Sequence, residues 1–594
     1  MNATTYRFGP CEIDEARRAL LVHGREVRLQ PRVFDLLCYL VRHRERVVSK
    51  DELLDALWPG TIVVDNALQR VVSLARGALA DVGLGEAVRT YARHGYRFCL
   101  VDCAAASAGD APVDAPGRVA EARAACERND WIAACDAYAA ADGQAPLPAD
   151  DVEPWGRAAI CAGLGPSAVA ALERVVAQRD AAGDTLGAAR GTLLLVQIRI
   201  DHKQSAIARG LLQRVSRYLD GQPDVVERGH FAWMASRMAL GTGDLALAMR
   251  MADEACTLGR ALRDPDVECL GLTYRGHALM GQGEVVAGLA QHEEAAAVIR
   301  LGGVRSWVAG WALCSILYAA RYRCDWLRAA QYAETFVEWS RSCSMPAFPG
   351  TCQLHRAAVL GVRGELERAA SEVRAAATLL AQAAPWAEGD AYCVLGDILL
   401  SHGDHGGAEA AFRQAHALGW DPQPGLARLH LLTGQPALAQ RGLERALEEV
   451  DWTLRERRVQ LLCLLVHAAI ATGEVDRARE ALHTLRSDPQ LLANEALKAM
   501  HGGAEAEMAL HDGDFKLAAQ KLRQAVRHWR EVGSPVGEAE TRMRLAECLL
   551  QDQDATGSEL ELHAVESHLA AVAAAHRERL ETLRDALTGL RGAT

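Results

Sequence analysis

The hydrophobic pattern of the chain changes near residue 104. Before this point, four short apolar or alternating runs separated by turn residues predict β-strands at 6–8, 11–14, 19–22 and 26–29. Apolar residues at helical spacing then predict three helices, which begin at Pro31, at the capping sequence 49–52 and at about Asp65. A last stretch from Val88 to Val101 predicts a β-hairpin with its tip near residues 93–95.

After residue 104 the pattern is a helical repeat. Residues 104–117 are small and include two prolines, which is typical of a tether. A turn residue then recurs at intervals of 31 to 41 residues, and the residue five positions later is Ala in ten cases and Gly288 in the other. The eleven turn residues are Asn129, Gly165, Lys203, Gly243, Gly283, Cys324, Gly364, Gly403, Gly434, Gly473 and Gly513. This spacing predicts stacked helical hairpins, with a small residue where paired helices approach closely.

The predicted fold class is therefore multidomain, with a small α+β domain followed by an all-α superhelix (an α-solenoid). The predicted boundaries are 1–103 for the first domain, 104–117 for the linker, 118–550 for about 11 hairpins of roughly 40 residues, and 551–594 for capping helices.

Charge is distributed unevenly between these parts. The 594 residues carry a net charge of −12, but residues 1–103 carry +2 and the remainder −14. The acidity excludes a uniformly basic nucleic-acid coat, and the 50% hydrophobic content excludes a mostly disordered chain. Only five of the 65 basic residues are Lys, so nearly every cation is a guanidinium suited to bidentate contacts. Whatever DNA affinity the chain has is expected in residues 1–103.

Four motifs in the first domain occur in the order found in a known family. They are Leu29–Leu37, Val47–Leu54 with Trp58–Pro59, Asp65–Leu68 and Gly95–Phe98. Together they resemble the OmpR/PhoB-type winged-helix DNA-binding domain. The resemblance implies a four-stranded sheet, three helices, a recognition helix in the major groove and a C-terminal wing at the minor groove.

Candidate DNA-binding residues follow from this resemblance. On the recognition helix they are Asn66, Gln69, Arg70, Ser73 and Arg76, and on the wing Arg89, Thr90, Arg93, His94 and Arg97. Amide side chains pair with adenine, arginine pairs with guanine, and hydroxyls contact phosphates. The alternative interpretation is that the polar residues of the helix form an ordinary solvated face.

The repeats resemble a tetratricopeptide array of the longer form found in MalT-type bacterial regulators. Aromatic and arginine residues gather within residues 305–348, and the candidate effector- or peptide-binding residues are Trp307, Trp311, Tyr318, Arg321, Tyr322, Arg323 and Trp326. Two interpretations remain open. The cluster either lines a pocket for a peptide or an anionic small molecule, or fills the core between hairpins where alanine is too small. Cys314, Cys324, Cys343 and Cys352 lie in the same stretch and are interpreted as reduced structural thiols rather than as a redox sensor.

Sequence motifs for catalysis or metal binding are missing. The chain has no phosphate-binding loop, no Gly-x-Ser-x-Gly or His-Glu-x-x-His motif, and no zinc-type cysteine spacing. The sequence His402–His405 coincides with a repeat turn. We therefore expect no enzyme activity, no cofactor and no metal site.

Segments that would direct the chain to a membrane or out of the cell are also missing. The first residues do not resemble a signal peptide, and the apolar stretch Trp307–Ala320 falls short of the ~20 residues that a membrane-spanning helix needs. A cytoplasmic protein without a membrane partner is expected.

The leading hypothesis is a sequence-specific DNA-binding transcriptional regulator whose helical repeats sense an effector or bind a partner protein. Expected partners are promoter DNA, RNA polymerase, an effector peptide, protein or small molecule on the array, and a second copy of the chain. The alternative is an interaction adaptor in which the winged helix docks protein rather than DNA.

Overall fold

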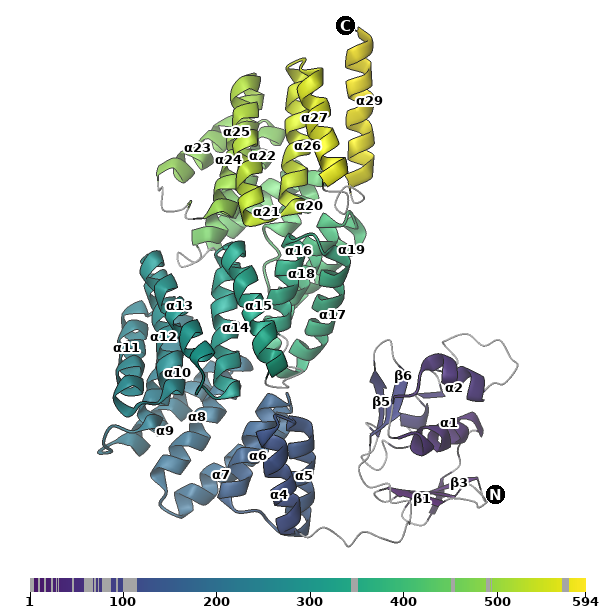
Figure 1. Ribbon diagram of the computed structural model, residues 1–594, viewed down its shortest axis with the longest axis vertical. Helices are drawn as coiled ribbons and strands as arrows, with labels where there is room; N and C mark the ends of the chain where they lie inside the picture. The colour runs from purple at the N-terminus through teal and green to yellow at the C-terminus, as the bar shows by residue number, and fades with distance from the viewer. Residues whose placement is uncertain are drawn as a thin grey trace. The chain divides into compact units, whose positions relative to one another are not determined.

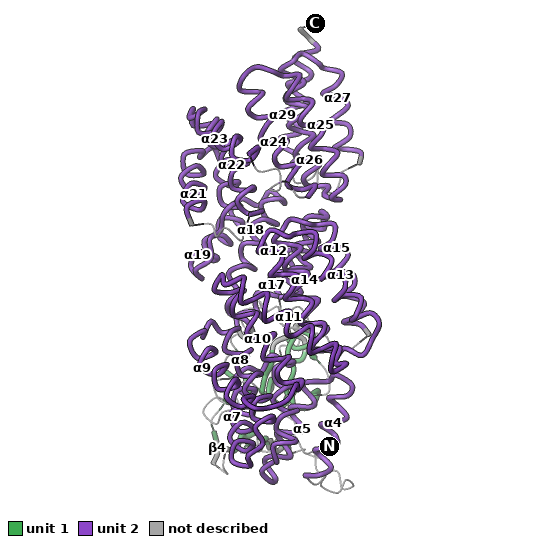
Figure 2. The backbone as a smooth tube through the Cα atoms, turned by 90° about the vertical axis from the view of Figure 1, so that its left-hand side faces the viewer, with its two compact units in different colours: residues 1–112 green, residues 113–594 purple. Residues whose placement is uncertain are grey.

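The computed structural model divides the chain into two compact units, residues 1–112 and 113–594 (Figure 2). The described residues of the first unit are 5–8, 11–14, 18–22, 25–27, 29, 31–44, 47–57, 68, 71–72, 74–76, 79, 87–91 and 95–99. Those of the second unit are 115–342, 351–449, 455–487, 492, 494–568 and 576–593.

The first unit begins with a four-stranded antiparallel sheet in the order β1-β2-β3-β4. Its strands are β1 (Thr5–Phe8), β2 (Cys11–Asp14), β3 (Ala19–Val22) and β4 (Arg25–Val27). The helices α1 (Pro31–Arg42) and α2 (Lys50–Leu57) follow, and the hairpin of β5 (Val88–Tyr91) and β6 (Gly95–Phe98) ends the unit. The predicted α+β class and the order of these elements are confirmed, whereas β4 begins one residue and ends two residues earlier than the predicted 26–29.

Local chemistry explains where the two helices begin. Pro31 occupies the first turn of α1, where its missing N–H has no intrahelical acceptor to lose. The Ser49 hydroxyl accepts a hydrogen bond of 3.2 Å from the Glu52 backbone N–H before α2. The Tyr39 hydroxyl donates to the Glu52 carboxylate at 2.9 Å and so links α1 to α2.

Most of the third predicted helix, from about Asp65 to Leu79, lies outside the described residues. All of its described positions are helical, and Leu68, Val71, Val72, Ala75 and Leu79 are buried in the core of the first unit, whereas Leu74 is exposed. The buried apolar positions therefore face the core, as the sequence pattern predicts.

The second unit is an array of antiparallel helical hairpins (Figure 1). The helices of its first half are α4 (Ala115–Glu127), α5 (Trp131–Gln144), α6 (Ala149–Cys161), α7 (Gly165–Ala181), α8 (Thr185–Asp201), α9 (Ser205–Leu219), α10 (Val226–Gly241), α11 (Leu245–Leu262), α12 (Pro265–Gly281), α13 (Val285–Leu301), α14 (Ser306–Tyr322) and α15 (Trp326–Ser342). Those of its second half are α16 (Thr351–Val362), α17 (Leu366–Ala383), α18 (Glu388–Ser401), α19 (His405–Ala417), α20 (Gly425–Leu432), α21 (Pro436–Glu449), α22 (Arg455–Thr472), α23 (Val475–Ser487), α24 (Glu495–His511), α25 (Phe515–Val532), α26 (Pro535–Gln551), α27 (Ala555–His568) and α29 (Arg577–Ala593). A short 3-10 helix, η2 (Pro385–Ala387), precedes α18.

The repeat turns have the backbone that the sequence pattern predicts. Ten of the eleven predicted turn residues adopt a positive φ, and three of these ten are Asn129, Lys203 and Cys324 rather than glycine. The small residue five positions after each of these ten turns is buried, so neighbouring helices pack closely there. In the α10–α11 turn, for example, the Asp244 backbone N–H donates to the Ala239 carbonyl and the Asp244 carboxylate accepts from the Leu247 N–H.

The second predicted turn is wrong by two residues. The residue with positive φ is Gly163, not Gly165, and the buried alanine is Ala168, whereas Ala170 is exposed. The reason is local, because Gly165 is the first residue of α7 and Pro166 occupies its first turn. The repeat continues one hairpin beyond Gly513, since Gln553 has a positive φ and Ser558 is fully buried. The hairpin of α26 and α27 thus spans the predicted boundary at residue 550.

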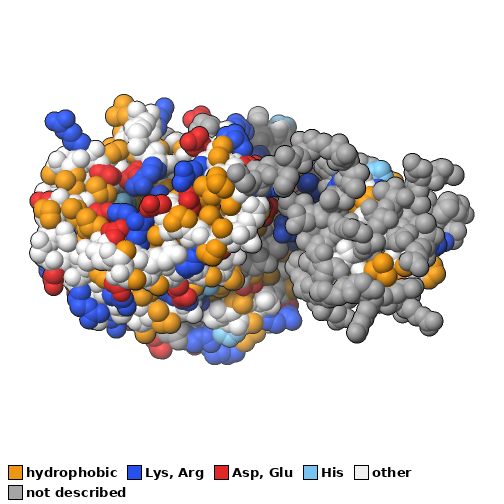
Figure 3. All heavy atoms as spheres, turned by 90° about the horizontal axis from the view of Figure 1, so that it is seen from below, with side chains coloured by type: hydrophobic (Ala, Val, Ile, Leu, Met, Phe, Trp, Pro, Cys, Tyr) orange, Lys and Arg blue, Asp and Glu red, His pale blue; other side chains and the backbone are white. Residues whose placement is uncertain are grey.

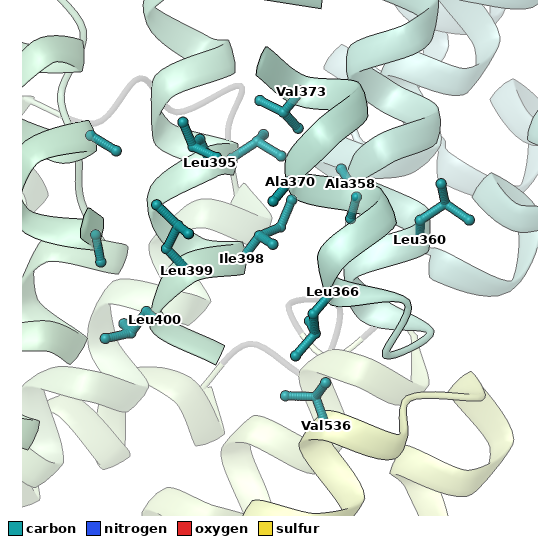
Figure 4. Close-up of a cluster of buried hydrophobic side chains, with 14 of the residues drawn as sticks. Ala358, Leu360, Leu366, Ala370, Val373, Leu395, Ile398, Leu399, Leu400 and Val536 are labelled. Carbon is teal, nitrogen blue, oxygen red and sulfur yellow. The ribbon is translucent and has the colours of Figure 1, made fainter. Parts of the chain in front are cut away.

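The array brings distant repeats together. Leu366 of α17 and Val536 of α26 share one apolar cluster, in which their side chains lie close to each other (Figure 4). The Asn494 side-chain amide donates to the Arg323 carbonyl at 2.6 Å, and Arg428 forms an ion pair with Glu540. Within the described part of the chain, no helix is both long enough and apolar enough to cross a membrane.

Candidate DNA interface and array hollow

The β5–β6 hairpin separates its apolar and basic side chains onto opposite faces. Val88 pairs with Phe98, and both are buried in the core of the first unit. The neighbouring pair in the register is Arg89 opposite Arg97, so both guanidinium groups lie on the other face of the hairpin. Arg89 is exposed and Arg97 is half-buried.

Gly95 fixes the hairpin against the start of α2. Tyr96 and Val48 exchange two backbone hydrogen bonds of 2.9 Å, which bring these two segments of the chain into direct contact at Gly95. A Cβ on Gly95 would lie 1.8 Å from the Val48 carbonyl oxygen, and the φ of +125° is a conformation that other residues rarely adopt. Only glycine fits this position, and the two hydrogen bonds tie the hairpin to the segment that precedes α2.

The facing arginines make this surface electropositive. Like charges directly opposite each other on a hairpin are unfavourable unless an anion lies between or beside them. Within the first unit's described residues, neither Arg89 nor Arg97 forms an ion pair with a carboxylate, although Arg97 Nε donates to the Arg44 carbonyl at 2.8 Å. The arrangement is therefore suited to contact with phosphate groups.

In the array, the predicted aromatic and arginine cluster separates into three environments. Trp307 and Trp311 of α14 line a hollow that they share with α6 and α8. Tyr318, Arg321 and Tyr322 lie farther along the same helix and are instead beside α16 and α18. The sequence alone could not separate these two groups, because all five residues belong to one helix.

Arg321 forms a buried ion pair. Its two terminal nitrogens donate to the two Asp390 oxygens at 2.7 and 2.6 Å, and His355 Nδ1 lies 3.0 Å from the same guanidinium. Burial disfavours a charged Asp390, yet the Arg321 guanidinium outweighs that penalty and holds the pKa of this carboxyl below its usual range. Burial raises the pKa of the adjacent Tyr318 to about 12.

Arg323 and Trp326 contact other parts of the array. Arg323 forms an ion pair of 2.7 Å with Glu456 of α22. Trp326 packs against three apolar clusters of the array. Both residues therefore join distant hairpins, and any ligand contact by them remains a prediction.

Comparison with known proteins bears on the first unit. Residues 24–98 match the family described as "Transcriptional regulatory protein, C terminal". The transcriptional activator CadC of Escherichia coli is 31% identical over 81 residues, which are 14% of this chain and 16% of CadC. The phosphate regulon regulatory protein PhoB of Rhizobium meliloti is 36% identical over 95 residues, which are 16% of this chain and 42% of PhoB.

This part of the chain is a DNA-binding domain of the OmpR/PhoB type. These matches cover only this domain. The chain spans less than half of the length of these curated relatives. The described residues of the second unit form the array of helical hairpins. A crystal structure of Rap protein complexed with competence and sporulation factor resembles the chain distantly, with a TM-score of 0.36 and 15% identity over 68% of this chain and 99% of that one.

Within the OmpR/PhoB-type domain, the structure places four of the ten predicted DNA-binding residues. Arg89 and Arg97 lie on the hairpin face described above, and Thr90 lies in β5 opposite Tyr96. Arg76 Nε donates to the Val88 carbonyl at 2.8 Å, which ties the third helix to the hairpin. The other six lie outside the described residues, namely Asn66, Gln69, Arg70, Ser73, Arg93 and His94.

The cysteine cluster of the array also divides. Cys314 Sγ lies 3.2 Å from the Thr351 hydroxyl, and hydrogen bonds from Cys352, His355 and Thr351 outweigh burial and lower the pKa of Cys314 to about 5. Cys324 is elsewhere, where its sulfur accepts a hydrogen bond from Gln460 and burial raises its pKa to about 12. Cys343 lies outside the described residues.

One group of side chains has the composition of a cation site. Glu495, His528 and Glu531 place one potential ligand atom each within 4.8 Å of one another. The Glu495 carboxylate already contacts Lys498 Nζ at 2.6 Å and His528 Nδ1 at 2.5 Å. These contacts account for the cluster as an ion-pair network on the surface of α24 and α25.

Proposed function

We propose that the protein is a sequence-specific DNA-binding transcriptional regulator whose helical array receives an effector or a partner. The observation that carries the first part is the Arg89–Arg97 pair on the outer face of the β5–β6 hairpin. Two guanidinium groups at this register repel each other in the free protein, and a phosphate backbone would relieve that repulsion.

The charge distribution supports the same assignment. Residues 1–103 carry a net charge of +2, whereas the rest of the chain carries −14 and is expected to repel DNA. Contacts with the duplex would therefore come from the first unit. The hairpin arginines supply sequence-independent phosphate contacts, and the third helix, with Asn66, Gln69 and Arg70, reads the bases.

The array has the properties of a binding platform. It exposes charged residues of both signs and brings aromatic side chains, among them Trp307 and Trp311, to a hollow between helices. We propose that an effector peptide, protein or small molecule binds to this part of the chain and alters transcription at the bound promoter. RNA polymerase and a second copy of the chain are the other partners expected of such a regulator.

A direct test is enrichment of fragmented genomic DNA by the full chain, followed by footprinting of the enriched fragments. We expect a small set of protected sites for the natural chain and for Arg413→Ala, a variant that removes one exposed guanidinium from α19. Arg70→Ala should lose most of the enrichment. No enriched fragment for the natural chain, together with stable capture of a partner protein, would instead favour the adaptor hypothesis.

A further inference from the structure

A hollow of about 430 Å³ lies between the first helices of successive hairpins in the N-terminal half of the array. Its wall is formed by α6, α8, α10, the start of α12 and the start of α14, and a smaller recess of about 60 Å³ adjoins it. The two share Arg157, Leu194, Gln197 and Trp307. The larger volume lies in the range typical of small-molecule sites.

Several hydrogen-bond donors around this hollow have no acceptor. The indole N–H groups of Trp307 and Trp311 and the Nε of Arg157 are buried, and none has a hydrogen-bond partner among the described residues. All three side chains line the recess. The indole N–H of Trp233, which lines the larger hollow, is also buried without a partner. Unpaired buried donors are costly and uncommon in folded proteins, so their grouping at one hollow calls for a ligand that accepts hydrogen bonds.

The acceptors that the protein itself provides nearby are already engaged. Asp201 accepts from Arg237 at 2.7 Å, and Glu227 accepts from Arg190 at 2.7 Å. Glu153 contacts Arg157 at 3.3 Å through a terminal nitrogen, which leaves Arg157 Nε unpaired. Asp266, at the start of α12, pairs with Arg305, and the Asp264 carboxylate accepts from the Val267 backbone N–H at 3.0 Å. The carboxylates of the wall therefore already accept hydrogen bonds, whereas the indole N–H groups and Arg157 Nε have no acceptor among the described residues.

The rest of the wall combines aliphatic side chains, among them Leu193 and Met234, with aromatic ones. The ring of His230 stacks on Trp307 with centroids 6.4 Å apart, and Trp233 meets Trp311 edge-on at 6.3 Å. Arg237 lies over the Trp311 ring at 4.6 Å. Burial, with a smaller contribution from Arg305, lowers the pKa of His230 to about 4, so this ring is neutral at pH 7 and adds no competing cation. A flat apolar group would fit between such walls.

We infer that this hollow and its adjoining recess bind a small aromatic carboxylate, with the ring against the Trp307 side chain in the larger hollow and the carboxylate accepting from the unpaired donors that line the recess. The inference rests on the proposed role of the array as the effector-receiving part of the chain. In this arrangement Trp307 and Trp311 contact the ligand. Arg321 and Arg323 do not, because they pair with Asp390 and Glu456.

The test is calorimetric titration of the full chain with indole-3-acetate and cinnamate, beside their uncharged counterparts indole-3-ethanol and cinnamyl alcohol. A short peptide ending in tryptophan, Gly-Gly-Trp, distinguishes a free small molecule from a peptide carboxyl terminus. We expect one-to-one binding of at least one of the two carboxylates, and binding at least tenfold weaker for the matching alcohol and for the peptide.

Variants locate the site. Trp307→Phe and Trp311→Phe keep an aromatic wall but remove one donor each, and each should weaken carboxylate binding roughly fivefold. Arg157→Lys provides a third variant that removes the unpaired Nε and should have a similar effect. Trp131→Phe is the matched control, because its indole N–H is also buried and unpaired but does not line the hollow. The control should bind like the natural chain.

Four results would overturn the inference. They are the absence of binding of both carboxylates at millimolar concentration, equal binding of the alcohols, preferential binding of the peptide, and undiminished binding in all three wall variants. DNA binding by the same preparations, measured in a gel shift without ligand, keeps this outcome separate from the proposed function. If the chain binds DNA but no carboxylate, only the inferred ligand is refuted. If the chain binds a carboxylate but no DNA, only the proposed function as a DNA-binding regulator is refuted.

Discussion

Three arginines of the array and two arginines of the first unit lie in opposite environments. In the array, Arg237, Arg321 and Arg323 are largely buried, and each contacts a carboxylate at 2.6 to 2.7 Å. On the hairpin of the first unit, Arg89 and Arg97 face each other, and Arg89 is exposed. These array arginines are thus neutralised by carboxylates of the protein itself, whereas the hairpin arginines have a charge that an external anion could neutralise.

This difference shows why a count of basic residues is a poor guide to DNA binding. Basic and acidic side chains are interspersed on the array face seen in Figure 3, which gives no single-sign surface there. Under the proposed function, a weak net charge of +2 in residues 1–103 would suffice for an interface because two arginines share one face of the hairpin. The contrast implies that the buried arginines of the array stabilise the fold and that the hairpin arginines bind DNA.

The largest effect is expected from breaking a buried pair in the array. Arg321→Ala should lower the free energy of unfolding by about 3–5 kcal/mol, because it leaves the Asp390 carboxylate buried without its partner. The measurement is urea denaturation followed by circular dichroism. The double variant Arg321→Met with Asp390→Leu should recover most of the loss, since it removes both charges together.

The exposed ion pair of Arg413 with Glu409 is the control for this experiment, and Arg413→Ala should leave stability unchanged. If Arg321→Ala were as stable as the natural chain, the buried pair would not hold the array together. The claim that buried arginines stabilise the array would then be wrong.

Acid should destabilise the array through its buried histidines. Burial lowers the pKa of His277 from 6.5 to about 4. Burial also lowers the pKa of its neighbour His292, whose ring centroid is 4.7 Å away, well below its usual value. A lowered folded pKa means that the unfolded chain binds the proton first, so stability is lost as the pH falls from about 6.5 toward 4. At about 1.4 kcal/mol per pKa unit, His277 alone accounts for up to about 3 kcal/mol.

Urea midpoints at pH 7 and pH 4.5 measure this effect. His277→Gln should reduce the difference between the two midpoints, whereas the exposed His563→Gln should not alter it. An equal midpoint at both pH values in the natural chain would show that the array tolerates unpaired buried charge.

On the DNA side, Arg70→Ala should cost about 2 kcal/mol of affinity for the footprinted site, a roughly thirtyfold loss, and should relax the preference at one base pair. This expectation comes from the sequence, since Arg70 lies outside the described residues. Competition between the footprinted site and single-base variants measures it. Arg70→Ala with unchanged affinity and base preference would show that the recognition face is assigned to the wrong residues.

Local patterns made most of the fold predictable. Turn residues with a small residue five positions later located ten of the hairpins, because a left-handed turn and a close helix contact each leave a mark within one short stretch. The turn at Gly163 was misplaced because Gly165 and Pro166 supply competing signals in the same loop. The last hairpin was not predicted as a repeat because Gln553 and Ser558 replace the usual Gly and Ala.

The sites were less predictable because they depend on contacts between distant residues. The sequence grouped Trp307 with Arg321, yet Arg321 pairs with Asp390, 69 residues away, and Trp307 borders a hollow with Arg157 and Gln197. No local pattern marks such contacts. On the hairpin, by contrast, the register of Arg89 and Arg97 follows from strand alternation, and the resemblance placed both on the wing.

The most direct test of the central claim is the salt dependence of DNA affinity for the natural chain and for Arg89→Ala. If Arg89 contacts a phosphate, the natural chain should lose affinity steeply with salt. The variant should bind all sequences about 1.5 kcal/mol more weakly at low salt, and its log–log slope should be shallower by about 1. Its stability should equal that of the natural chain, because Arg89 is exposed. An identical slope and affinity in the two proteins would contradict the assignment of the hairpin arginines to DNA.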